Sequence, residues 1–172
     1  MGLICGLVYN GSKQAAFAVR AKGGISVGIL REELRHNLLN AGAVLVGFAT
    51  LEGNEKLPYP ALTAVVSFAV KLEPADDSVW SFARAYFDAE PKMAMLAEHV
   101  KASVRRYGFN GEVMPKAVLD MEHPDTEFPS QAAAIAAGLA VRGEDGLLVT
   151  KDYGKLVRFG TVFTDATWKK NF

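Results

Sequence analysis

The most informative shortage in this sequence is cysteine, because its 172 residues contain only one, Cys5. One thiol excludes an internal disulfide, and an iron–sulfur cluster held by the chain itself normally needs about four cysteines. Histidine is also scarce, and His36, His99 and His123 show no metal-ligand spacing among themselves. These shortages predict a reduced, cytoplasmic protein with no iron–sulfur cluster and no histidine metal site.

Net charge and long apolar runs are missing as well. Nineteen basic and nineteen acidic residues cancel, which removes the electrostatic reason to expect nucleic acid as a partner. No apolar run approaches the roughly 20 residues of a membrane span, and the first residues lack the basic segment of a signal peptide. We therefore expect neither nucleic acid nor a membrane among the partners.

What the chain does contain is the composition of one globular domain, with half its residues hydrophobic and 22% charged. Residues 1–24 stand apart from the rest. Their Asn10-Gly11 pair is typical of a hairpin turn, although the alanine-rich run that follows also suits a short helix. We expect residues 1–24 to form an arm or hairpin and residues 25–172 to form the domain.

Apolar periodicity divides the domain into helices and strands. The expected elements are a helix from Val27 to Ala41, strands at 43–50 and 61–72, helical segments after Ser78 and from Pro91, a strand at 110–119, a helix from Pro129 to Gly138, and a hairpin of two strands at 146–150 and 157–164. Helices and strands do not alternate regularly. The pattern predicts an α+β fold, a single domain with a mixed, mainly antiparallel sheet flanked by helices.

Two groups of side chains could suggest chemistry in the middle of the chain. The helix from Pro91 carries an apolar stripe with a methionine and an aromatic residue, which we interpret as core packing rather than a cofactor-binding surface; its members are Met93, Leu96, Ala97, Val100, Val104 and Tyr107. The loop 122–127 gathers one histidine and three carboxylates. We interpret it as a solvated acidic loop, with a metal site as the alternative.

A glycine-rich stretch, Gly138 to Gly143, has a partial likeness to a nucleotide-binding loop. That motif needs a strand before it and a helix after it, whereas here a helix is expected before it and a strand after it. We therefore reject a dinucleotide-binding interpretation.

The residues around this stretch support a different comparison. The run FPSQAAAIAAGLAVRGEDGLLVTKDYGKLVRFGTVFTDA, together with GAVLVGFATLE, Tyr59-Pro60 before ALTAVVSFAV, ARAYF and RRYGF, resembles the epoxyqueuosine reductase and reductive dehalogenase group. The resemblance covers roughly Leu30 to Trp168. It implies a nitroreductase-like fold and a cobalamin-binding domain, with flavin as the alternative cofactor.

The resemblance also implies roles for individual residues. It places Asp125 near the catalytic aspartate of the reductases, a proton donor. It assigns cofactor binding to Ser130, Gly138, Arg142, Gly143, Gly146, Leu147 and Tyr153. No protein metal ligand follows from it.

The sequence departs from the family pattern at two positions and in its cysteine content. Ala140 stands where the family has its second glycine, and Glu144 stands where it usually has lysine. The lack of cluster cysteines implies that electrons would come from a separate donor protein. The alternative is a non-catalytic binding or interaction module that keeps the fold with an altered cofactor site, and a homodimer is the second expected partnership.

Overall fold

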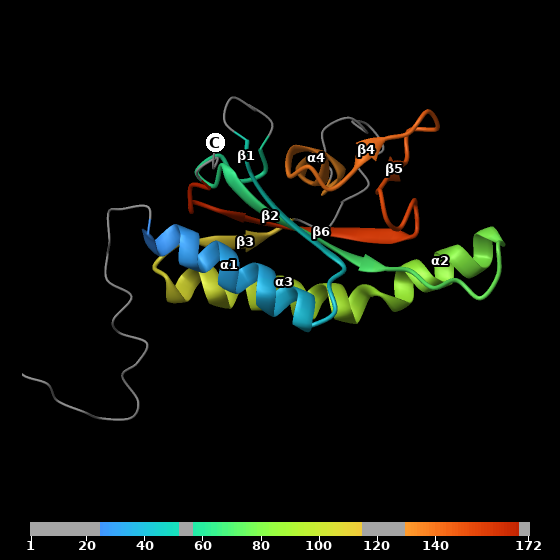
Figure 1. The fold of residues 1–172 in the computed structure, drawn as a ribbon, viewed down its shortest axis with the longest axis horizontal. Coiled ribbons are helices and arrows are strands. Elements are labelled where there is room, and N and C mark those ends of the chain that lie inside the picture. The colour runs from blue at the N-terminus through green and yellow to red at the C-terminus, as the bar shows by residue number, and fades with distance from the viewer. Residues whose placement is uncertain (1–24, 52–56, 115–129, 169–172) are drawn as a thin grey trace, which may run out of the picture.

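The computed structural model describes residues 25–51, 57–114 and 130–168. In chain order the elements are α1 (Ile25–Asn40), β1 (Leu45–Thr50), β2 (Ala64–Lys71), α2 (Val79–Asp88), α3 (Glu90–Arg106), β3 (Gly111–Val113), α4 (Ser130–Ala136), β4 (Val141–Arg142), β5 (Leu148–Val149) and β6 (Val157–Thr164). Figure 1 shows them as helices on either side of a central sheet. The predicted α+β fold is confirmed.

The central sheet has four strands in the order β1-β2-β6-β3, and each neighbouring pair is antiparallel. Strand β2 pairs with β6 along its whole length, from Ala64 opposite Thr164 to Lys71 opposite Val157. Apart from Lys71, every residue of β2 is buried. This burial agrees with the nearly continuous apolar run in the sequence, since a strand covered on both faces needs no polar alternation.

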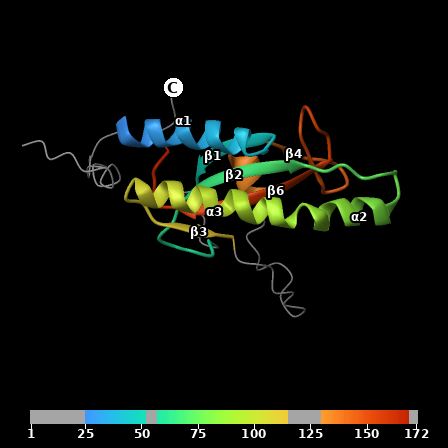
Figure 2. The same ribbon diagram turned by 90° about the horizontal axis from the view of Figure 1, so that it is seen from below.

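Helices α1 and α3 lie side by side and cover one face of the sheet (Figure 2). Helix α1 buries Leu30, Leu34 and Leu38, which recur every four residues and so share one side of the helix. Helix α3 contributes Met93, Leu96, Ala97, Val100 and Val104 to the same cluster. Large aliphatic side chains therefore fill this face of the domain.

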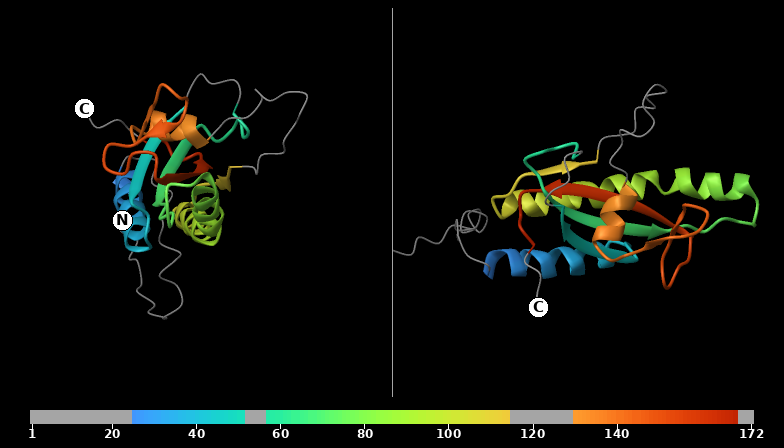
Figure 3. Two further views of the ribbon diagram at one scale, coloured as in Figure 1. Left: turned by 90° about the vertical axis from the view of Figure 1, so that its right-hand side faces the viewer. Right: turned by 90° about the horizontal axis from the view of Figure 1, so that it is seen from above.

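The opposite face of the sheet carries α4 and the β4–β5 pair (Figure 3). Helix α4 buries only Ala133 and Ala134. Its approach is close, because a Cβ atom added at Gly47 of β1 would lie 2.9 Å from the Ala137 methyl group and from the Leu139 side chain. Small residues on both sides of this contact let the helix lie almost on the backbone of the sheet.

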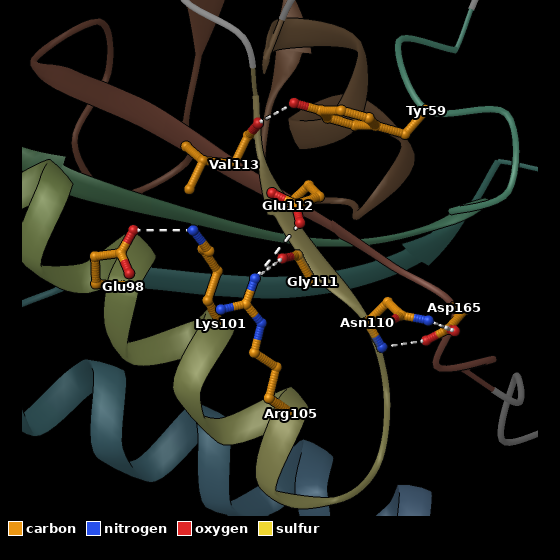
Figure 4. A network of polar contacts seen from close by, with 9 residues as sticks. All are labelled: Tyr59, Glu98, Lys101, Arg105, Asn110, Gly111, Glu112, Val113 and Asp165. Atoms are coloured by element: carbon orange, nitrogen blue, oxygen red, sulfur yellow. Dashed lines mark hydrogen bonds and ion pairs between the residues drawn. The ribbon is translucent and has the colours of Figure 1, made fainter.

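A set of polar contacts fastens β3 to its neighbours (Figure 4). The Asp165 carboxylate accepts hydrogen bonds from the backbone and side-chain nitrogens of Asn110, both at 2.7 Å. Tyr59 donates its hydroxyl to the Val113 carbonyl at 3.0 Å. Asp165, which follows β6, therefore holds the start of β3 in place.

The structure corrects one predicted feature and confirms another. The segments 146–150 and 157–164 do not form a hairpin with each other, because β5 pairs with β4 while β6 pairs with β2 and β3. The apolar stripe of α3 does pack in the core, as predicted, whereas no residue of α2 is buried. The strand expected at 110–119 is described only as β3, and its later part lies outside the described residues.

The arm at 1–24, Asp125 and the acidic loop 122–127 also lie outside the described residues. Within the described ranges, no group of three or more histidine, cysteine or acidic side chains could hold a metal ion. None of the helices in those ranges combines the length and apolar character that a bilayer crossing requires.

Candidate functional site

The candidate site is a small two-stranded ribbon, formed by β4, β5 and the turn between them. Val141 pairs with Val149 and Arg142 pairs with Leu148. The pairing continues into the turn, where the Gly143 N–H donates to the Leu147 carbonyl at 2.8 Å. Gly146 has a φ of 80°, a conformation that glycine adopts without the steric cost other residues incur. This explains why a glycine occupies the end of the turn.

A second tight turn, residues 150–154, follows the ribbon directly. The backbone N–H of Thr150 donates to the Gly154 carbonyl at 2.8 Å, and that of Gly154 donates back to the Thr150 carbonyl at 3.1 Å. The Thr150 hydroxyl accepts from the Tyr153 N–H at 3.1 Å. Tyr153 is thereby held, half-buried, beside the ribbon.

An ion pair between Asp145 and Lys155 ties the first turn to the second. The hydrogen bond from Lys155 holds the pKa of the Asp145 carboxyl below its usual value, and a bond from the Leu147 N–H acts in the same direction. The turn is therefore closed by its own side chains and backbone.

The two faces of the ribbon differ in what they contact. Ala140 and Leu148 point inward, where they form a buried cluster with Ala134 of α4 against Phe159 of β6. Val141 and Val149 are cross-strand partners, so their side chains share the other face. Leu147 lies on that face as well, since side chains alternate along a strand.

The outward face is apolar and open to solvent. Val141 is 67% exposed and Leu147 is 51% exposed. Gly143 lies on this face without a side chain, and a Cβ there would come within 3.2 Å of a Val149 methyl group. The result is a shallow apolar surface of Val141, Leu147 and Val149, which we call the ribbon face.

The structure describes both positions at which the sequence departs from the family pattern, Ala140 and Glu144. The Ala140 methyl group is buried in the inward cluster, so it does not project toward a ligand on the ribbon face. Glu144 is exposed at the tip of the turn.

Most of the predicted cofactor-binding residues come together here. Gly138, Arg142, Gly143, Gly146, Leu147 and Tyr153 all lie in the segment from the end of α4 through the two turns. Gly138 has a φ of 71° and follows α4, as predicted for a helix-ending glycine. Ser130 lies apart from them, at the first residue of α4. Their roles toward a cofactor stay predictions.

Sequence reasoning missed two features near this site. It did not select Val141 or Val149, because two-residue strands leave no periodic pattern. It also did not select Ser67 and Thr161, which are cross-strand partners on β2 and β6. Both hydroxyls are fully enclosed on the α4 side of the sheet, and neither has a hydrogen-bond partner among the described residues.

The fold that carries this ribbon occurs in known reductases. A solved epoxyqueuosine reductase labelled with selenomethionine superposes with a TM-score of 0.61 at 17% identity, over 84% of this chain and 48% of that chain. The epoxyqueuosine reductase from Bacillus subtilis gives 0.59 at 16% identity, over 84% and 47%. The fold resemblance inferred from the sequence is thereby confirmed.

A reductive dehalogenase whose reaction is described as B12-dependent also shares the fold. It superposes with a TM-score of 0.59 at 25% identity, over 81% of this chain and 20% of that chain. The present chain thus spans about half the length of the epoxyqueuosine reductases and about a fifth of the dehalogenase. No protein-family model and no curated protein matches the sequence.

Proposed function

We propose that this chain is a corrinoid-binding redox domain, with cobalamin as its cofactor and the ribbon face as part of the binding surface. The observation that supports this most is the exposed apolar ribbon face on a fold shared with a B12-dependent dehalogenase. An apolar surface that a protein leaves open to water commonly marks a binding site.

The residues of the ribbon suit a broad, flat ligand. Val141, Leu147 and Val149 would cover one side of a macrocycle and keep water from it. Gly143 adds no side chain to this surface, and a Cβ atom there would crowd the Val149 methyl group. When bound, a corrinoid supplies a cobalt centre that accepts and returns electrons.

Polar groups at the rim would orient the ligand. The Arg142 guanidinium is exposed and donates to the Gly146 carbonyl at 3.2 Å. Arg142 pairs with Leu148 and so starts from the side opposite the ribbon face. We propose that its long side chain reaches around the edge of the ribbon to amide or phosphate groups of the corrinoid, at the loss of that one exposed hydrogen bond. We also propose Asp125 as the proton donor, in a cytoplasmic protein that receives electrons from a separate donor protein.

The test is an absorbance titration of the purified protein with cobalamin, in both its cobalt(II) and cobalt(III) states. We expect a shift to the spectrum of the form without its lower base. Leu147→Asp should weaken binding at least about tenfold, because burying a leucine side chain contributes about 1.5–3 kcal/mol. Leu39→Asp is the matched control, since Leu39 is similarly exposed but lies on α1, across the sheet.

The absence of any shift at tens of micromolar cobalamin in both oxidation states would refute the corrinoid proposal. The same titration with flavin mononucleotide tests the alternative cofactor. Equal loss of binding in Leu147→Asp and Leu39→Asp would place the cofactor away from the ribbon face.

A second candidate is a non-catalytic binding module with an altered cofactor site. It is favoured by Glu144, which puts a negative charge at the exposed tip of the turn. Under this proposal the unmodified chain does not bind cobalamin, and Glu144→Lys creates binding. Ala140→Gly is not needed, because the Ala140 methyl group is buried away from the ribbon face. Turnover of a substrate by the unmodified chain with an external reductant would eliminate this candidate.

A further inference from the structure

Helix α2 is strongly apolar yet buries no residue among those described. Trp80 is 85% exposed, Val79 81% and Phe87 73%. These large exposed fractions are concentrated on one short helix. A contiguous exposed apolar patch of this kind usually marks an interaction surface.

The apolar residues of α2 occupy most of its circumference. At about 100° per residue, Ala85, Phe82, Tyr86, Val79, Ala83, Phe87 and Trp80 follow one another around an arc of roughly 220°. The polar side is narrow and carries Ser81, Arg84 and Asp88. Among the described residues, the contacts of this arc with the rest of the domain are those of Ala85 with the core cluster and of Tyr86 with Arg158 of β6, so Val79, Trp80 and Phe87 stay largely exposed.

The helix is held firmly in this position. Its first turn is capped by Ser78, whose hydroxyl accepts from the Ser81 N–H at 3.1 Å. Arg158 of β6 donates to the Tyr86 carbonyl at 2.7 Å, and its guanidinium lies 4.2 Å from the centre of the Tyr86 ring. Figures 1 and 2 show α2 projecting past the end of the sheet.

We propose that α2 is a homodimer interface, in which it packs antiparallel against α2 of a second copy of this chain. The arrangement of side chains is self-complementary. Ala83 is half-buried and lies near the middle of the helix and within the apolar arc, with Val79 and Trp80 toward the N-terminus of the helix and Tyr86 and Phe87 toward its C-terminus.

A twofold axis at Ala83 places Val79 opposite Phe87 of the second copy and Trp80 opposite its Tyr86. The small residue at the crossing point lets the two backbones approach, and the large side chains on either side interdigitate. Arg84 and Asp88 stay on the solvent side of the pair. A closed twofold dimer is also the commonest symmetric assembly.

The area available is sufficient for a weak specific dimer. Aromatic side chains contribute about 150–250 Å² each when buried, so the exposed parts of Trp80, Phe87, Val79, Tyr86 and Phe82 amount to roughly 600 Å² per copy. Complete burial of these parts in both copies would remove roughly 1,200 Å², so the interface is at most at the lower limit of specific interfaces. We therefore expect dimerisation at micromolar concentrations rather than an obligate dimer.

The first test is sedimentation equilibrium of the full chain from about 1 to 100 µM, which brackets micromolar dissociation constants. We expect a monomer–dimer equilibrium that Ala83→Glu abolishes, because a charge would be buried at the crossing point. Ala94→Glu is the matched control, since Ala94 is an exposed alanine on α3 and the charge change is identical. A wild-type chain that stays monomeric to 100 µM overturns the proposal.

A disulfide trap tests the position of the axis. In a Cys5→Ser background, Ala83→Cys should oxidise to a covalent dimer, because a disulfide needs Cα atoms within about 7 Å. Ala94→Cys in the same background should not. Dimerisation without preferential cross-linking at position 83 would show that the copies meet elsewhere, and it would overturn the proposal as well.

Discussion

The two faces of the central sheet are built on different principles. The face under α1 and α3 is filled by large side chains such as Leu34, Phe68 and Leu96, all fully buried. The face under α4 has a smaller cluster, in which large residues such as Val65 and Phe163 pack against the small residue Ala133 of the helix, and the nearby ribbon leaves Leu147 exposed. The difference indicates that the α1–α3 face buries the larger cluster of side chains, while the α4 face brings a helix close to the backbone of the sheet.

The largest expected effect comes from truncating the α1–α3 face. Leu96→Ala should lower the free energy of unfolding by about 2–5 kcal/mol, because it leaves a cavity in a fully packed cluster. Ala134→Gly on the α4 face should cost about 1 kcal/mol, mainly through helix propensity. Urea denaturation measures both, and equal losses would contradict the proposed difference between the faces.

Filling the close contact beneath α4 should have the next largest effect. Gly47→Ala places a methyl group 2.9 Å from Ala137 and Leu139, so we expect a loss of about 1–3 kcal/mol from overpacking. Gly28→Ala is the matched control, because a Cβ there meets nothing within 4 Å. Inside helix α1 the added methyl group should stabilise by about 0.5–1 kcal/mol. If both changes were neutral, α4 would not be packed closely on β1.

The enclosed hydroxyls on the α4 side give a smaller test. Ser67 and Thr161 have no hydrogen-bond partner among the described residues, and burying an unsatisfied hydroxyl is unfavourable. Ser67→Ala and Thr161→Val should therefore be neutral or stabilise by up to about 1 kcal/mol. A clear destabilisation by Thr161→Val, measured by thermal unfolding, would mean that these hydroxyls bind a water molecule or a ligand group.

The smallest expected effect concerns the charge at the ribbon turn. The Asp145 pKa is lowered, chiefly by the hydrogen bond from Lys155. The carboxylate thus stabilises the fold above its unfolded pKa of about 4, and this contribution is lost as the pH falls through the lowered folded value.

Carbon-13 NMR of the carboxyl group would follow this titration directly. Lys155→Ala should raise the Asp145 pKa toward its ordinary value. The pKa of Asp76 is also lowered, but chiefly by a hydrogen bond to Ser78, so it should not move in that variant. An unchanged Asp145 pKa would show that the ion pair does not hold the turn.

The helices and the central strands could be predicted from the sequence, because their side chains repeat over many residues. Leu30, Leu34 and Leu38 define the buried side of α1 on spacing alone, and the apolar run of β2 indicates a central strand. The resemblance to the reductases includes the segment that forms the ribbon.

The sequence predictions failed where a local residue pattern does not determine which distant segment an element contacts. The pairing of β5 with β4 could not be predicted, because two-residue strands carry almost no pattern and β6 has better partners in β2 and β3. The exposure of Trp80 and Phe87 could not be predicted from the sequence either. An apolar stripe shows that a helix needs a partner, but not whether that partner lies in the same domain.

The position of β6 has a consequence for how the domain folds. The strand pairs with β2 on one side and with β3 on the other, although both partners precede it by many residues in the chain. Loop-closure entropy must therefore be overcome before this pairing contributes, which slows folding. During synthesis the first two thirds of the domain would wait with the facing edges of β2 and β3 unpaired, and the sheet could close only after Thr164 had left the ribosome.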